Sequence, residues 1–141
     1  MIDWVVDEVS LLRSPMGTIS GTVLLRVDGI GFPEERWSDF PLPVTVAWLE
    51  ELFQIASGNR GKREVYFMEG PFRVELKCES RDLVRLTCIE RHRIIHHTAV
   101  APVPELRKNA KAAARRLLRE CHLRGWSNHD VDTLAAINKI P

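Results

Sequence analysis

The sequence lacks long apolar runs and any segment that resembles a secretory signal. Its longest apolar stretches, such as residues 19–25, are interrupted by small and polar residues and are far shorter than the roughly 20 apolar residues that span a bilayer. The N-terminal region carries Asp3, Asp7 and Glu8 in place of the basic start and apolar stretch of a signal peptide. We therefore expect a cytoplasmic protein that does not enter a membrane.

Cysteine is scarce, and its three copies match no metal-binding spacing. Cys78 and Cys88 fall at apolar positions of strand patterns, and Cys121 falls on the apolar side of a helical pattern. These positions favour buried, reduced thiols that pack as small hydrophobic groups. A disulfide between Cys78 and Cys88 on adjacent strands is geometrically possible but would be unusual in a reducing cytosol.

Recognisable catalytic motifs are also absent. There is no Gly-x-Ser-x-Gly elbow and no His-Glu-x-x-His, and no pair of carboxylates stands out for acid–base chemistry. His92 and His96 have no third zinc ligand nearby, and the basic, glycine-rich loop 58–63 lacks the Ser or Thr that follows the lysine of a phosphate-binding loop. We therefore expect a protein that is not an enzyme and has no cofactor or metal.

The length and composition favour one globular domain spanning residues 1–141. The 141 residues are close to the usual size of a single domain, and 45% hydrophobic with 28% charged residues is ordinary for a globular protein. A chain of this size buries enough surface to fold without disulfides or metals.

The periodicity of apolar residues predicts an α+β fold. Residues 72–79 alternate between apolar and charged residues, which is typical of a strand with one buried face. Apolar residues at helical spacing predict helices over residues 43–57 and from Pro104 to about residue 123, and a short helix follows. We expect an antiparallel sheet of about five to six strands, one helix after the N-terminal strands and two C-terminal helices. Residues 4–12 fit either a strand or a short helix, and Gly21 indicates a bulge or a close backbone contact.

The net charge of +1 hides an uneven distribution of charge along the chain. Residues 1–80 contain 8 Lys and Arg against 13 Asp and Glu, a net charge of −5. Residues 81–141 contain 12 Lys and Arg against 6 Asp and Glu, a net charge of +6. Because patches of one sign steer charged partners, this division predicts a binding protein.

The acidic half offers a candidate surface for a basic protein partner. Trp37 and Phe40 lie among carboxylates, and an aromatic anchor surrounded by acids combines affinity with fast association. The candidate partner-binding residues are Asp28, Glu34, Glu35, Trp37, Asp39, Glu50 and Glu51. The alternative interpretation is that the two aromatic residues fix this segment to the core and that the acids are merely solvated.

The helix expected over residues 104–124 offers a basic face as an alternative. Its cations are Arg107, Lys108, Lys111, Arg115 and Arg119. Such a face neutralises phosphates in nucleic-acid-binding proteins. However, the charge lies on the first of two successive helices, and the second helix has few side chains able to contact bases. A solvated basic face is the simpler interpretation, with a nucleic-acid-binding module as the alternative function.

The order of these features resembles small immunity proteins of bacterial toxin systems, such as contact-dependent inhibition. The resemblance rests on the segment GTVLLRVDGIGFPEERWSDFPLPVTVAWLEEL and on a later strand pair with a Glu-Gly-Pro-Phe turn. The positions that carry the resemblance are Phe32, Pro33, Trp37, Asp39, Phe40, Trp48, Leu49, Leu52 and residues 69–72. It implies a protein without enzymatic activity that binds and blocks a cognate toxin, often a nuclease, inside the producing cell. It transfers no interface residue, and it favours a protein partner over a nucleic acid.

Overall fold

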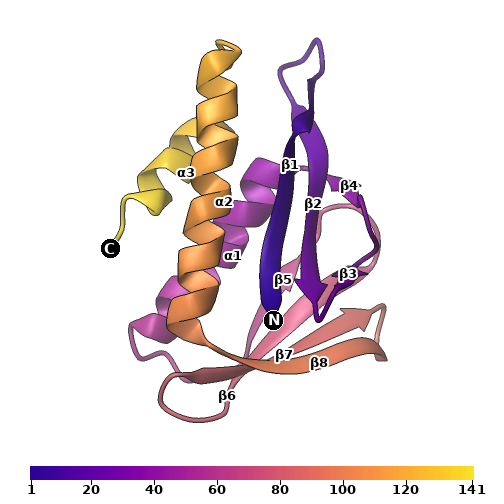
Figure 1. Cartoon of the computed structure of the whole chain (residues 1–141), viewed down its shortest axis with the longest axis vertical. Coiled ribbons are helices and arrows are strands. Elements are labelled where there is room, and N and C mark those ends of the chain that lie inside the picture. The colour runs from indigo at the N-terminus through magenta and orange to yellow at the C-terminus, as the bar shows by residue number, and fades with distance from the viewer.

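A computed structural model describes residues 1–141, and in it the strands form two four-stranded antiparallel sheets (Figure 1). The first sheet contains β1 (Ile2–Arg13), β2 (Ile19–Val27), β3 (Ile30–Phe32) and β4 (Ser38–Asp39). The second contains β5 (Arg63–Tyr66), β6 (Phe72–Cys78), β7 (Leu83–Glu90) and β8 (Ile94–Pro102). Helix α1 (Pro41–Ala56) connects the sheets, and α2 (Val103–Leu123) and α3 (His129–Asn138) close the chain. The α+β class and the placement of all three helices are confirmed.

Strand β2 is central in the first sheet because it pairs with β1 along one edge and with β3 and β4 along the other. Three successive residues, Val23, Leu24 and Leu25, are buried, so both of its faces are covered. Opposite β2, the register of β1 shifts between Asp7 and Leu12. The expected close contact at Gly21 is found here, because a Cβ atom at Gly21 would lie 2.8 Å from the Leu11 side chain.

The second sheet is a meander in the order β5-β6-β7-β8. Its inner face is apolar, with Val74, Leu76, Val84 and Leu86 all buried. The helices lie beside the first sheet, and the second sheet runs beneath them in the view of Figure 1 with one face uncovered. Strand alternation therefore leaves a polar outer face on the second sheet.

One hydrophobic core connects both sheets and all three helices. Its centre is aromatic: Trp4 of β1 stacks on Trp48 of α1 with 4.9 Å between ring centroids. Phe67 lies 6.0 Å from Trp4 and from Phe32, which carries the aromatic contacts from the first sheet to the second. None of the three helices has the length and apolar character needed to cross a bilayer.

Helix α2 is fixed along β1 by polar contacts as well as by its apolar side. Arg116 donates to the Val6 carbonyl and forms an ion pair with Glu8. Arg124 donates to the carbonyl of Leu11 at 2.6 Å. Arg116 on α2 and Arg124 directly after it therefore hold the fold together and are not free for a partner.

Candidate protein-binding surfaces

Asp39 is a structural residue and not a surface anchor. Its side chain is only 2% exposed. One carboxylate oxygen accepts hydrogen bonds from the Trp37 indole at 3.0 Å and from the Glu69 main chain at 3.1 Å, and the other accepts from the Phe40 main chain at 2.7 Å. The expectation that Asp39 meets a partner is thereby corrected, because both oxygens are buried and occupied.

Trp37 belongs to the same internal structure. Its ring packs edge-on against Phe72 with 5.2 Å between centroids, and it is half-buried. The alternative in which the aromatic residues fix this segment to the core therefore describes Trp37. The sequence did not predict that Trp37 would contact the turn between β5 and β6, which belongs to the other sheet.

The remaining acids of the candidate set do not gather into one negative surface. Asp28 pairs with the N-terminal amine, Glu35 with Arg26 at 2.7 Å, and Glu51 with Arg63. These pairs lower the pKa of Asp28 and Glu35, chiefly through hydrogen bonds to the paired cations. The carboxylates of Glu34 and Glu50 form no ion pair, and these two remain candidate contact residues.

The two segments that carry the family resemblance are far apart in the sequence but meet in the structure. The turn at residues 69–72 is joined to the segment 32–40 by the hydrogen bond between Glu69 and Asp39. Phe72 also contacts Phe32, with 5.7 Å between ring centroids. These contacts fix the β5–β6 turn rigidly to the first sheet.

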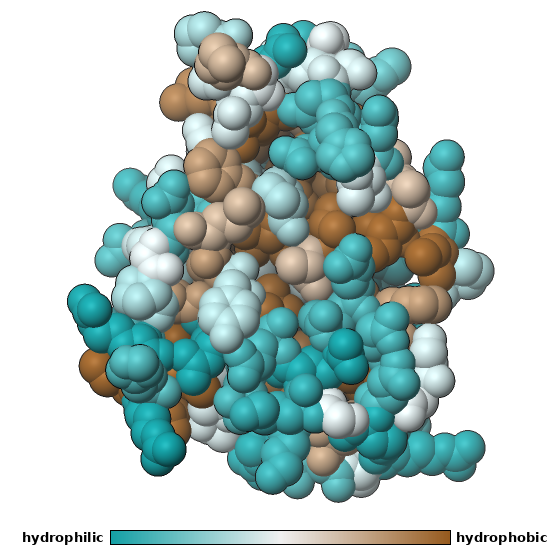
Figure 2. All heavy atoms as spheres, turned by 180° about the vertical axis from the view of Figure 1, so that it is seen from behind, coloured by the Kyte–Doolittle hydropathy of each residue, from teal (hydrophilic) through white to brown (hydrophobic).

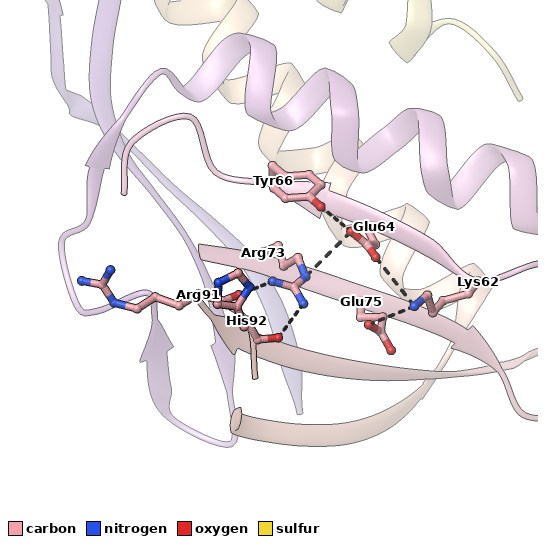
Figure 3. A network of polar contacts seen from close by, with 7 residues as sticks. All are labelled: Lys62, Glu64, Tyr66, Arg73, Glu75, Arg91 and His92. Atoms are coloured by element: carbon pink, nitrogen blue, oxygen red, sulfur yellow. Dashed lines mark hydrogen bonds and ion pairs between the residues drawn. The ribbon is translucent and has the colours of Figure 1, made fainter. Parts of the chain in front are cut away.

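Arg73 organises the polar groups next to this turn (Figure 3). Its guanidinium donates to the main-chain oxygens of Arg91 and His92 in the β7–β8 turn and lies 3.8 Å from the carboxylate of Glu64. Glu64 also accepts a hydrogen bond from Tyr66 at 2.5 Å, and this bond raises the pKa of Tyr66. The outer face of the second sheet is thus an ordered network that connects both turns.

A shallow pocket of about 400 Å³ lies between these two turns. We call its lining residues the hairpin surface: Tyr66, Gly70, Pro71, Phe72, Arg73, Arg91 and His92. Tyr66 is 59% exposed. Arg91 has a left-handed backbone with φ of 56°, and its side chain extends away from Arg73 in Figure 3. Strained backbone in a non-glycine residue is concentrated at binding and catalytic sites.

Figure 2 shows the hydropathy of the back of the molecule. Hydrophobic side chains gather in the middle and upper part of that view, while the lower part, where Figure 1 places the second sheet, is mostly hydrophilic. Exposed apolar groups do occur on the second sheet, with Ile95 61% and Val100 42% exposed.

The basic residues of α2 form a separate surface on the helix side of the molecule. Arg107, Lys108, Lys111 and Arg115 line one groove of about 320 Å³ together with Pro104 and Pro141, and no apolar side chain other than proline lines it. Arg119 lines a different hollow beside Glu8 and Glu120. Four of the five expected cations are therefore brought together.

The histidines and the loop 58–63 make local contacts within the fold. His96 lies 2.9 Å from Glu90, while His92 contributes a main-chain oxygen to Arg73. No group of three His, Cys, Asp or Glu side chains is placed to hold a metal. In the loop 58–63, Arg60 donates to main-chain oxygens and Lys62 lies near Glu64 and Glu75, so these cations are already engaged.

The three cysteines are free, and they should differ in reactivity. Cys88 lies opposite Val74 and Cys78 opposite Val84, so the two thiols are not paired across the strands. Burial raises the pKa of Cys88 to about 12 and also raises that of Cys121, which keeps both thiols neutral and unreactive at about pH 8.

We expect a thiol reagent to modify the half-buried Cys78 first and the other two only after unfolding in urea. Rapid labelling of all three in the native protein would contradict this.

No protein-family model, curated protein or solved structure matches this chain.

Proposed function

We propose that this protein binds a cognate bacterial toxin and neutralises it by protein–protein contact. The hairpin surface is the docking site. The observation that carries the proposal is the joining of the segments 32–40 and 69–72 into one rigid support beside an exposed tyrosine and two arginines.

The hairpin surface has the chemistry of a protein interface. Tyrosine and arginine are enriched among the residues that contribute most to binding energy. Tyr66 is exposed, yet its hydroxyl is already oriented by Glu64, and the Arg91 main chain is held by Arg73. Because these groups are ordered before binding, less conformational entropy is lost when a partner docks.

A surface close to the first sheet could extend this contact. Glu34 lies in the segment that supports the β5–β6 turn, and its carboxylate is exposed and unpaired. A free carboxylate here would accelerate association with a basic toxin such as a nuclease. Asp39 contributes by holding the turn in place, not by touching the partner.

The test is co-expression with the protein encoded in the neighbouring reading frame. If that protein arrests growth of a bacterial host, this chain should restore growth, and the purified pair should bind in isothermal titration calorimetry. Replacing two anchors, Tyr66→Ala with Arg91→Glu, should weaken binding by on the order of 100-fold or more, since each hot-spot residue contributes about 2 kcal/mol.

The matched control is Leu12→Ala with Arg13→Glu. Leu12 is 70% exposed and Arg13 is exposed, and both lie at the end of the β1–β2 hairpin, opposite the second sheet in Figure 1. This pair should leave toxin binding unchanged. A neighbouring frame that encodes a metabolic enzyme, or a toxin that this chain fails to neutralise, would reject the immunity function. Full protection by the Tyr66 and Arg91 variant would reject only the hairpin surface.

A further inference from the structure

The groove on α2 is unusual because its cations have no acidic partner. Arg107 and Lys111 donate to the main-chain oxygens of Pro141 and Ile140, while Lys108 and Arg115 make no ion pair and are exposed. Elsewhere on α2 the pattern is different, since Arg116 pairs with Glu8. No acidic side chain lines the groove, so the charges of Lys108 and Arg115 are uncompensated.

This arrangement destabilises the helix that carries it. Arg107, Lys111 and Arg115 follow one another at four-residue intervals, and like charges at this spacing each disfavour a helix by about 0.2–0.5 kcal/mol. Burial, followed by the charges of Arg107 and Arg115, lowers the pKa of Lys111. A bound anion would relieve both effects, and departures from local stability rules are typical of functional sites.

We infer that this groove binds the phosphate backbone of a nucleic acid duplex. The cations from Arg107 to Arg115 extend over about 12 Å, which is eight residues at 1.5 Å each. Duplex DNA carries a charge about every 1.7 Å of its axis, so this length faces several phosphates. The inference is independent of the proposed toxin binding, because it concerns a different surface.

The composition of the groove selects this ligand over others. A protein interface has an apolar core, and proteins that bind single strands use aromatic side chains as stacking platforms. No aromatic or aliphatic residue lines the groove, whose lining consists of two prolines and four cationic residues. Phosphates need only the cations, and arginine holds two phosphate oxygens at once. Binding should therefore be independent of base sequence.

The salt dependence of binding gives a sharp test. A short fluorescein-labelled DNA duplex is titrated with the full chain at about 50 to 200 mM salt, and binding is followed by fluorescence anisotropy. Lys108 and Arg115 are the two cations of the groove that no main-chain oxygen occupies, and their two phosphate contacts predict a slope of log K against log salt of about −1.8, which is 0.9 for each phosphate. The variant Lys108→Ala with Arg115→Ala should remove most of this slope.

The matched control is Lys77→Ala with Arg93→Ala, which removes the same charge from two exposed, unpaired residues, one on β6 and one in the β7–β8 turn. This variant should keep the slope of the unmodified protein. The inference is overturned if the duplex does not bind at about 50 mM salt, or if the two variants lose affinity equally. It is also overturned if a single strand of the same length binds more tightly, or if a poly-glutamate peptide competes as well as the duplex, which would assign the groove to an acidic protein. Circular dichroism of each variant verifies folding.

Discussion

Replacing Asp39 by alanine should lower the free energy of unfolding by about 3–5 kcal/mol. The substitution leaves three donors without an acceptor: the Trp37 indole and the main-chain N–H groups of Phe40 and Glu69. A buried donor that loses its partner costs about 1–3 kcal/mol. The loss is measured by urea unfolding followed by tryptophan fluorescence.

Asparagine at this position distinguishes the role of each oxygen. In Asp39→Asn, the amide oxygen still accepts hydrogen bonds, but the NH2 group replaces the second carboxylate oxygen and faces the N–H groups that this oxygen had accepted from. Either Phe40 or the pair of Trp37 and Glu69 then loses its acceptor. We expect a loss smaller than that of alanine but still above about 1 kcal/mol.

The stability of these variants separates a structural carboxylate from a contact residue. If Asp39 acted at an interface, Asp39→Ala would unfold at the same urea concentration as the unmodified protein and would fail only in toxin binding. Glu34→Ala is the matched control, since its carboxylate is exposed and makes no ion pair. It should leave stability unchanged. An Asp39 variant as stable as this control would restore the residue to the candidate interface.

The elements with regular periodicity were predictable from the sequence. The strict alternation over residues 72–79 corresponds to β6, and the helical stripe over residues 43–57 corresponds to α1, which begins two residues earlier at Pro41. Local patterns determine these elements because each has one buried face. The ambiguous residues 4–12 became a strand because Trp4 and Val6 alternate into the core.

Features that depend on long-range contacts were not predictable. Periodicity does not record which strands pair, so the sequence predicted one sheet of about five to six strands where the structure has two sheets of four. In the sequence, Asp39 cannot be distinguished from the other acids of its segment. Its buried hydrogen bond with the main chain of Glu69, thirty residues away, is visible only in the structure. Arg73 occupies an ordinary outward position in a strand, and its role depends on the β7–β8 turn brought alongside it. The uncompensated charge on α2 likewise required knowing where Glu8 and Glu120 lie.

Trp48 should be the most sensitive position in the core. It is 1% exposed and stacks on Trp4, which connects α1 to the first sheet. Replacing a buried tryptophan by alanine removes its contacts and leaves a cavity, at a cost of about 3–5 kcal/mol. With a total stability of about 5–15 kcal/mol for a domain of ordinary size, Trp48→Ala should lie near the limit of folding.

Phenylalanine at the same position should be tolerated far better. The Trp48 indole N–H is buried and has no hydrogen-bond partner, whereas the indole of Trp4 donates to Thr45 at 3.0 Å. Trp48→Phe loses part of the ring but also removes an unsatisfied donor, whose burial costs about 1–3 kcal/mol. Trp4→Phe instead leaves the Thr45 hydroxyl without its donor. In urea unfolding, Trp48→Phe should therefore be less destabilised than Trp4→Phe, and the reverse order would show that ring volume dominates over hydrogen bonding in this core.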